Sequence, residues 1–256
     1  MKNEIQVFFT ALMFYTRIPC PSWVDHSEEY LNKATRYFPL IGWIVGAVAS
    51  LVIFTGSFIF PPTIVVTLAL AASVLLTGAF HEDGFADVCD GFGGGWTTDK
   101  ILLIMKDSRL GTYGVVGMLL LFALKIFTLA ALLRLDLWFC IYALMLAHVG
   151  SRFTAVTVMR SHEYAREDAT SKVKPLAKKL SISDFLISAI WVIPAFLLFP
   201  SLLILGVCIP LFLFKIYLAA YFQKWIGGYT GDCLGAVQQI SFVVILLYAL
   251  AIWRFI

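Results

Sequence analysis

Residues 137–158 read LWFCIYALMLAHVGSRFTAVTV, an apolar run whose only charged residue is Arg152. The hydrocarbon core of a bilayer is about 30 Å thick, and an α-helix of about 20 residues spans it. Lipid offers the backbone no hydrogen-bonding partner, so a segment of this kind satisfies its own amide and carbonyl groups as a helix. The run therefore predicts a membrane-spanning α-helix.

The rest of the chain has the same character. Of its 256 residues, 61% are hydrophobic and 14% are charged, whereas a soluble domain has about 25% charged residues. Further apolar runs occupy residues 38–60, 63–80, 111–133, 183–199, 201–222 and 236–254. We therefore predict a single all-α domain over residues 1–256, a polytopic integral membrane bundle of about seven spanning helices. The shorter segment 1–18, which includes Arg17, predicts an interfacial helix. The net charge of +3 gives no reason to expect nucleic-acid binding.

The connections between these runs fall into two groups. Very short turns, with Arg134 as their only basic residue, lie at 61–62, 134–136 and 200. Longer segments, which hold most of the chain's Lys and Arg residues, lie at 1–37, 81–110, 160–182 and 223–235. Basic segments stay on the cytoplasmic side of a membrane. We therefore predict a multi-pass protein of the cytoplasmic (inner) membrane, with its active site at the cytoplasmic face and its C-terminus outside.

The most acidic segment is HEDGFADVCDG at residues 81–91. A helix would place Asp83, Asp87 and Asp90 on one face, because they are spaced i, i+4 and i+7, and these like charges would repel one another. Their position beside an apolar run indicates a bound cation. Hard carboxylate oxygens suit Mg²⁺ that carries a phosphorylated substrate. Glu82 is out of phase with the three aspartates. The alternative is a solvated acidic loop at a helix end.

Residues 105–114, MKDSRLGTYG, form a second polar motif just before an apolar run. Asp107 supplies a carboxylate, Arg109 suits a bidentate phosphate contact, and Lys106 suits a point-charge contact. The backbone N–H groups of Gly111 and Thr112 would lie at the start of the next helix, where anions are favoured. The alternative is a basic anchor on the cytoplasmic side.

Residues 227–235, GGYTGDCLG, form a third polar motif on the same side of the membrane. Thr230 and Asp232 suit a metal ion or a ribose hydroxyl. The alternative is a glycine-rich turn in which an aspartate caps the last helix. The local pattern leaves both interpretations open.

Four ionisable residues fall within the apolar runs, namely Lys125, His148, Arg152 and Lys215. Such side chains are costly in lipid, so they usually face a cavity or a partner. Lys125 and Arg152 are our candidates for an internal anion site. We expect His148 to be a hydrogen-bonded packing residue, and Lys215 either faces the interior or reaches to the membrane surface.

Five motifs together resemble those of a known family. They are FYTRIPCP at 14–21, YFPLIGWIVGA at 37–47, GAFHEDGFADVCDGFGGG at 78–95, DKILLIMKDSRLGTYG at 99–114 and GGYTGDCLGA at 227–236. In this order and at this spacing, the chain resembles the cobalamin synthases, the adenosylcobinamide-GDP ribazoletransferases, over nearly its whole length.

The resemblance implies a membrane enzyme of the last step in assembling the nucleotide loop of vitamin B12. Such an enzyme joins adenosylcobinamide-GDP to α-ribazole, or to its 5′-phosphate, and releases GMP with Mg²⁺ as cofactor. The implied metal ligands are Asp83, Asp87, Asp90 and Asp232. A homo-oligomer, or association with other enzymes of the same pathway, is left open.

The motifs and the resemblance together give the candidate site. The candidate catalytic residues are Asp83, Asp87, Asp90, Asp107 and Arg109. The candidate substrate and phosphate contacts are Arg17, His81, Lys106, Lys125, Arg152 and Thr230. Gln239 departs from the pattern, because it stands where some members have an acidic residue, so no metal role is assigned to it.

Two other functions compete with this one. A CDP-alcohol phosphotransferase performs analogous chemistry, but its pattern has an Ala-Arg pair after the DG, whereas Asp87 follows Ala86 here. A secondary transporter would use Lys125 and Arg152 along its pathway. Against a transporter, the polar motifs gather at one membrane face, and the two halves of the chain show no paired interrupted helices.

Overall fold

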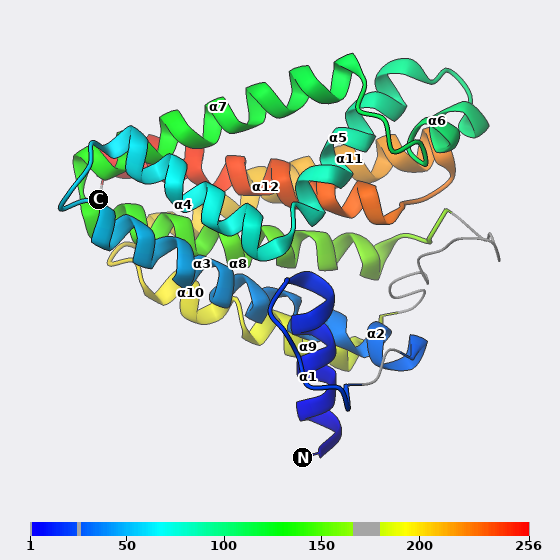
Figure 1. Ribbon diagram of the computed structural model, residues 1–256, viewed down its shortest axis with the longest axis horizontal. Coiled ribbons are helices and arrows are strands. Elements are labelled where there is room, and N and C mark those ends of the chain that lie inside the picture. The colour runs from blue at the N-terminus through cyan, green and yellow to red at the C-terminus, as the bar shows by residue number, and fades with distance from the viewer. Residues whose placement is uncertain (1, 25–26, 166–179, 256) are drawn as a thin grey trace.

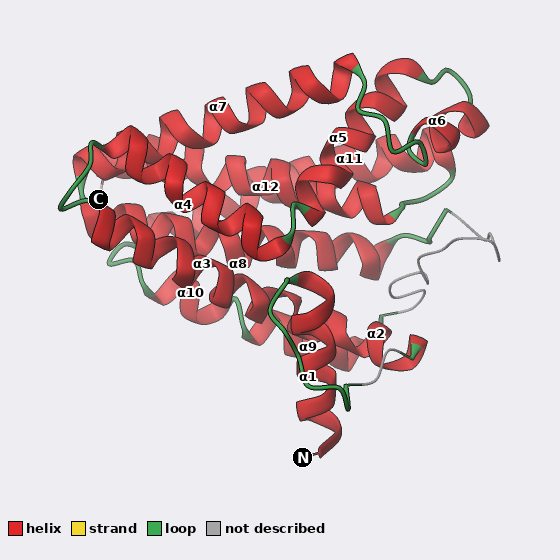
Figure 2. Cartoon of the chain, in the orientation of Figure 1, coloured by secondary structure: helices red, strands yellow, loops and turns green. Residues whose placement is uncertain are grey.

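A computed structural model describes residues 2–24, 27–165 and 180–255, so part of the predicted basic segment 160–182 lies outside the described residues. The α-helices are α1 (Lys2–Tyr15), α2 (Glu28–Ala34), α3 (Phe38–Gly56), α4 (Pro62–Thr77), α5 (Phe80–Gly94), α6 (Thr98–Ile104), α7 (Thr112–Leu135), α8 (Leu137–Ser161), α9 (Ile182–Ile190), α10 (Ile193–Leu197), α11 (Cys208–Ile226) and α12 (Gly231–Ile252). Short 3-10 helices are η1 (Thr35–Tyr37), η2 (Leu202–Val207) and η3 (Trp253–Phe255). Helices and loops make up the described chain (Figure 2), which confirms the all-α prediction.

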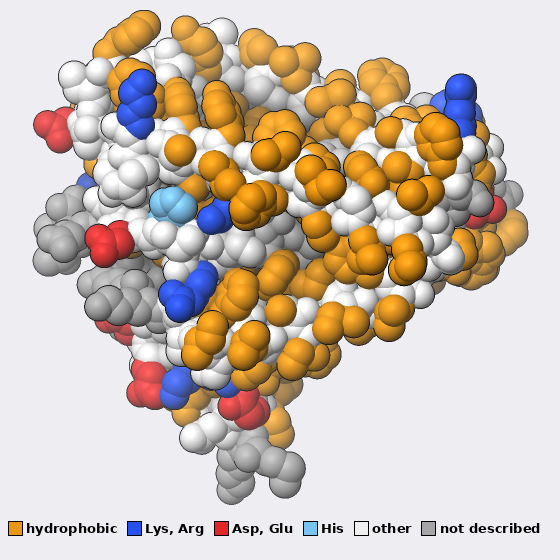
Figure 3. Space-filling view, turned by 180° about the vertical axis from the view of Figure 1, so that it is seen from behind, with side chains coloured by type: hydrophobic (Ala, Val, Ile, Leu, Met, Phe, Trp, Pro, Cys, Tyr) orange, Lys and Arg blue, Asp and Glu red, His pale blue; other side chains and the backbone are white. Residues whose placement is uncertain are grey.

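Helix α8 lies at the centre of the bundle and packs along α3 and α12 (Figure 1). Its side chains are buried on all sides, as Cys140, Leu144 and Val149 illustrate with no exposed surface. A helix that is apolar all round belongs inside a bundle, which is why this run shows no amphipathic pattern. The outer helices α7 and α11 instead leave large apolar side chains such as Leu119 and Phe212 exposed. Hydrophobic side chains accordingly cover much of the face of the molecule shown in Figure 3.

The number of spanning helices is smaller than predicted. Among the described residues, five helical segments are long and apolar enough to cross a membrane, or six if α4 and α5 together count as one broken span. The predicted run 183–199 forms only the shorter apolar pair α9 and α10, which breaks just before Pro194. Proline inside a helix removes a hydrogen bond and clashes with the preceding turn. The polytopic bundle is confirmed, whereas the count of about seven is not.

The break between α4 and α5 bends the chain by 92°. Gly78 has φ +66° and caps α4 in the left-handed conformation, which glycine adopts without strain. Ala79 follows with φ +58°, a conformation that L-residues with a side chain seldom adopt. A side chain at Gly78 would collide with Arg17, so the α1–α2 connection also requires glycine there. As a result, α5 begins inside the bundle, where the sequence analysis placed a loop.

The two ends of the bundle differ as predicted. One end carries the turn before α4, the turn before α8 and the C-terminus (Figure 1). The other end carries α6, the connection into α7 and the segment between α11 and α12. Most charged side chains visible in Figure 3 gather toward this second end. The three polar motifs therefore meet at one end of the molecule.

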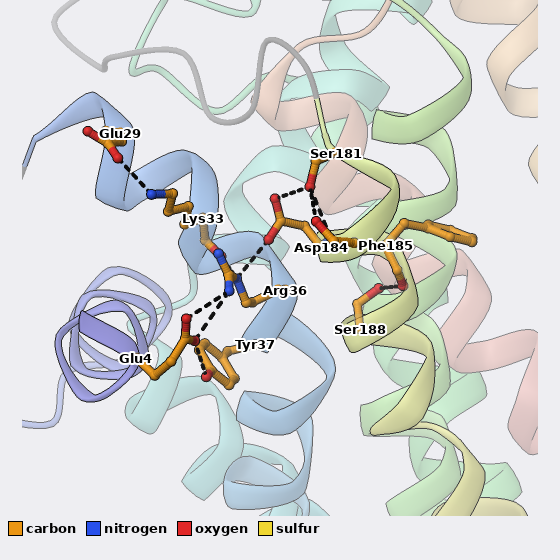
Figure 4. A network of polar contacts seen from close by, with 10 residues as sticks. Glu4, Glu29, Lys33, Arg36, Tyr37, Ser181, Asp184, Phe185 and Ser188 are labelled. Carbon is orange, nitrogen blue, oxygen red and sulfur yellow. Dashed lines mark hydrogen bonds and ion pairs between the residues drawn. The ribbon is translucent and has the colours of Figure 1, made fainter. Parts of the chain in front are cut away.

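Helix α1 runs crosswise to the bundle (Figure 1), as a helix lying along a membrane surface would. A polar network holds it there (Figure 4). The Arg36 guanidinium contacts Glu4 of α1 at 3.1 Å and Asp184 of α9 at 2.8 Å. The Tyr37 hydroxyl donates to Glu4 at 2.8 Å. Because Arg36 is buried and joins two helices, it fixes α1 to the bundle.

Candidate functional site

The acidic face of α5 meets the first turn of α12. A Cβ atom at Gly84 would lie 2.9 Å from the Cα atom of Asp232, so only glycine permits this close approach of the two backbones. Gly84 lies between Asp83 and Asp87 in the sequence, and the contact brings Asp232 beside the turn that carries both. Asp83 is exposed, while Asp87 and Asp232 are half-buried. Three of the predicted ligands thus come from two packed helices.

Asp90 has a different environment. Its two carboxylate oxygens accept hydrogen bonds from the backbone N–H groups of Gly111 at 2.7 Å and Gly114 at 2.8 Å. The side chain is only 9% exposed. Asp90 therefore caps the N-terminus of α7 from the neighbouring helix. The sequence analysis expected an anion at Gly111, and the structure supplies it from within the chain.

The loop between α6 and α7 carries an exposed ion pair. The Arg109 guanidinium contacts the Asp107 carboxylate at 2.6 Å, and the Arg109 side chain is 87% exposed. Hydrogen bonds from Arg109 hold the pKa of Asp107 below its ordinary value. An exposed pair of this kind contributes little to stability and is easily exchanged for another partner. Arg109 is therefore accessible to a phosphate that enters from the end of the bundle. Lys106 is also exposed.

Thr230 caps the N-terminus of α12. Its hydroxyl oxygen accepts a hydrogen bond from the backbone N–H of Cys233 at 3.3 Å and donates to the Asp232 carboxylate at 3.3 Å. Thr230 is fully buried, so it positions Asp232 and leaves the first contact with a ligand to the carboxylate. The capping alternative is therefore correct for this turn, although the capping residue is Thr230 and not the expected aspartate.

The ionisable residues of the apolar runs form a separate buried cluster. Lys125 of α7 donates to the Gln239 amide oxygen and lies 4.0 Å from Glu82. The Gln239 amide group in turn donates to Glu82 at 2.8 Å. Arg152 of α8 donates to the backbone carbonyl of His148 at 2.8 Å. Lys125 and Arg152 thus lie in one cluster, and Glu82 is its carboxylate.

These residues line a cavity of about 20 Å³ together with His81 and Gln238. A single water needs about 10–15 Å³ on this scale, so the cavity has room for a water and not for a phosphate group. Lys125 and Arg152 therefore have partners from the protein itself, namely Gln239 and Glu82 for Lys125 and the His148 carbonyl for Arg152. Their predicted contact with substrate phosphate stays a prediction that would require the cavity to open.

Sequence reasoning missed the role of Glu82. The signal was present, because Glu82 is out of phase with the aspartates and so lies on a different side of α5, where it is buried in the bundle. Two buried cations in neighbouring runs also require a counter-charge in a low-dielectric interior. Arg17, by contrast, is exposed beside the bend at Gly78, where its backbone N–H donates to Leu76 at 2.7 Å.

The acidic face has the chemistry of a magnesium site without a preformed cluster. Across the described ranges, no three His, Cys, Asp or Glu side chains stand close enough together to hold a metal ion. Asp83, Asp87 and Asp232 nevertheless offer hard oxygen donors at the meeting point of two helices, which is the donor type that Mg²⁺ selects. Asp90 fits less well, because both of its oxygens already accept backbone hydrogen bonds.

The fold and the site together define a polytopic membrane protein with an acidic site at one end of its bundle. Comparison with known proteins identifies the family: the cobalamin-5-phosphate synthase model matches residues 7–251, and the chain belongs to this family. The predicted resemblance is thereby confirmed, and the CDP-alcohol phosphotransferase and transporter alternatives are set aside.

Curated relatives match over nearly the whole chain. The adenosylcobinamide-GDP ribazoletransferase of Shewanella frigidimarina is 45% identical and the alignment covers 98% of this chain and 96% of the relative. The protein of the same name from Shewanella amazonensis is 44% identical over 98% of this chain and 97% of its own. That of Leptospira interrogans is 43% identical over 93% and 92%. No solved structure matches the chain significantly.

Proposed function

We propose that this chain is an adenosylcobinamide-GDP ribazoletransferase. It joins adenosylcobinamide-GDP to α-ribazole, or to α-ribazole 5′-phosphate, and releases GMP. The observation that carries the proposal is the identity of 43–45% with relatives of that name over nearly the full length of both chains. The acidic face of α5 and α12 supports it, because the reaction breaks the phosphoanhydride bond of a pyrophosphate, forms a phosphodiester, and needs charge neutralisation around both phosphates.

Asp83, Asp87 and Asp232 would hold magnesium at this site. The bound ion neutralises charge on the pyrophosphate and on the departing GMP. The positive end of α12, a helix of 22 residues, lies next to Asp232 and favours the same anion. Asp90 keeps the start of α7 attached to α5, so its contribution is to the shape of the site.

The remaining residues assist the transfer. Arg109 exchanges Asp107 for a phosphate oxygen, and Lys106 adds a second positive charge at the same end of the bundle. A hydroxyl of α-ribazole attacks the phosphorus attached to cobinamide, and the bond to the GMP oxygen breaks. Asp83, the exposed carboxylate of the three, accepts the proton of that hydroxyl. The nucleophile belongs to the substrate, so no protein nucleophile is required.

The location follows from charge. The longer segments on the side of the polar motifs hold most of the chain's Lys and Arg residues, and these residues favour the cytoplasmic side of the inner membrane. We therefore assign the acidic face to the cytoplasmic side, where a nucleotide-bearing substrate is present. Association with a second copy, or with other enzymes of the pathway, stays a prediction.

Substitution of the carboxylates tests the proposal. Asp83→Asn, Asp87→Asn and Asp232→Asn should each lower GMP release from adenosylcobinamide-GDP by about 100-fold or more, while the protein stays folded. Asp99→Asn is the matched control, because Asp99 is an exposed carboxylate at the start of α6. Full activity in any of the first three would remove that residue from the site. Equal losses in the control would remove the assignment of the site altogether.

A further inference from the structure

A second cavity lies between the start of α5 and the neighbouring helices. Its volume is about 60 Å³, and it is lined by residues of α1, α3, α5, α8 and α12. The ring-bearing side chains around it are Phe14, Tyr15, Phe38, Phe80, His81 and Tyr164. No Asp, Glu, Lys or Arg side chain is among its lining residues in the described part of the chain. The cavity therefore suits an apolar, flat group.

Three of the rings stack on one another, with Phe38 as the shared member. Tyr15 stacks on Phe38 with centroids 4.1 Å apart and planes 16° apart, and His81 stacks on Phe38 at 5.5 Å and 11°. Phe80 meets His81 edge-on at 5.3 Å. Aromatic side chains in such arrangements bind nucleic-acid bases by stacking, whatever the base sequence. These rings give the cavity, which we call the slot, flat apolar walls.

Two polar atoms in this lining have no partner among the described residues. They are the Tyr15 hydroxyl and His81 Nε2, and the two side chains are only 2% and 3% exposed. The Thr35 hydroxyl, which also has no hydrogen-bond partner among the described residues, lies close enough to the Tyr15 hydroxyl to lower its pKa slightly. Burial raises the pKa of Tyr15, so its hydroxyl keeps its proton and can donate. Buried polar atoms are normally hydrogen-bonded, so these unpartnered atoms on residues that line the cavity favour a ligand that carries a polar atom as well as a ring.

The cavity adjoins the acidic face. Gly231 and Gly235 of α12 line it, and Asp232 lies between them in the sequence. Gly231 is exposed and Phe80 is 44% exposed, so the lining reaches the surface of the molecule. At about 10–15 Å³ for one water, the volume is that of roughly four to six waters, which is enough for a small aromatic ring system.

We propose that this cavity binds the fused aromatic base of α-ribazole and so directs the ribose hydroxyl toward the α5 and α12 aspartates. The inference rests on the proposed function and names the subsite of its second substrate. A benzimidazole base presents two apolar faces and one free ring nitrogen, which the Tyr15 hydroxyl or the His81 ring can donate to. Guanine, the other base in the reaction, presents a carbonyl, a ring N–H and an amino group on one edge, and the slot offers too few polar atoms to satisfy them.

Steady-state kinetics on purified protein in detergent, with both substrates varied, test the inference. Phe80→Ala should raise the KM for α-ribazole roughly 10-fold or more, as expected for loss of base stacking. Tyr15→Phe removes one oxygen and should raise that KM roughly 3- to 10-fold, as expected for one hydrogen bond. The KM for adenosylcobinamide-GDP should stay within twofold of its wild-type value. Phe85→Ala is the matched control, because Phe85 lies on the same helix but faces Gly117 of α7.

The outcomes separate the two proposals. If wild-type protein releases no GMP when supplied with both substrates, the proposed function fails. If wild-type protein is active and the KM for α-ribazole is unchanged in Tyr15→Phe and Phe80→Ala, only the base subsite is overturned. A rise in the KM for adenosylcobinamide-GDP alone would also overturn it, by placing guanine in the slot. Tyr15→Phe keeps the aromatic ring, so we expect this variant to fold. Calorimetric measurement of α-ribazole binding to each variant repeats the test without turnover.

Discussion

Replacement of Asp90 separates a structural carboxylate from the proposed catalytic ones. The Asp90 oxygens accept two backbone hydrogen bonds, at 2.7 and 2.8 Å, at the positive end of a 24-residue helix. A hydrogen bond to a charged group contributes about 1.5–3 kcal/mol, and loss of a cap costs about 0.5–2 kcal/mol. Because these contributions overlap, we expect Asp90→Ala to lower the free energy of unfolding by about 3 kcal/mol. Asp90→Asn retains one acceptor oxygen and should lose about half as much.

Chemical denaturation of the purified protein in detergent measures this difference, with Asp83→Asn as the comparison. Asp83 is exposed, so its replacement should change the free energy of unfolding by less than about 0.5 kcal/mol. It should nevertheless abolish GMP release, whereas Asp90→Asn should keep measurable activity at temperatures where it is folded. The reasoning is refuted if Asp90→Ala is as stable as wild type, because the two hydrogen bonds would then carry no free energy.

Three further perturbations follow from the packing and the charges. Glu82→Gln leaves Lys125 without its carboxylate inside the bundle and should lower the free energy of unfolding by about 3–5 kcal/mol. The double variant Glu82→Gln with Lys125→Met should recover most of that lost stability. Additive losses from the two substitutions would contradict the pairing. Gly84→Ala should separate α5 from α12 and reduce GMP release more than 10-fold, which a wild-type rate would disprove. Because Arg109 lowers the pKa of Asp107, their pairing persists above the unfolded pKa of about 3.9 and is lost as the pH falls through the lowered folded value. In Arg109→Gln, NMR of the Asp107 carboxyl group should show the pKa of Asp107 rising toward its ordinary value. An unchanged pKa of Asp107 would refute the contact with Arg109.

The sequence predicted the elements whose structure depends on local composition. An apolar run of more than 20 residues forms a helix in lipid whatever surrounds it, so α8 and α12 lie where the pattern placed them. The grouping of polar motifs at one end also followed from loop length and charge. The run 183–199 was different, because Pro194 interrupts it and only the packing decides whether the pieces still form a span.

The candidate site was predictable in composition and less so in geometry. Helical spacing placed Asp83 and Asp87 on one face correctly, but nothing local revealed that Asp90 would meet the start of α7, which is a contact between distant segments. The bend at Gly78 and Ala79 is likewise set by packing against Arg17. It moves Glu82 into the bundle, where it becomes the partner of cations from other helices.

The central claim is that this chain transfers a phosphoryl-linked cobinamide to α-ribazole. The most direct measurement supplies purified protein in nanodiscs with adenosylcobinamide-GDP, α-ribazole and Mg²⁺, and quantifies the products by mass spectrometry. The account predicts adenosylcobalamin and GMP in equal amounts, with neither formed by Asp87→Asn. GMP without the joined product would reveal a hydrolase, and the absence of both products would contradict the claim.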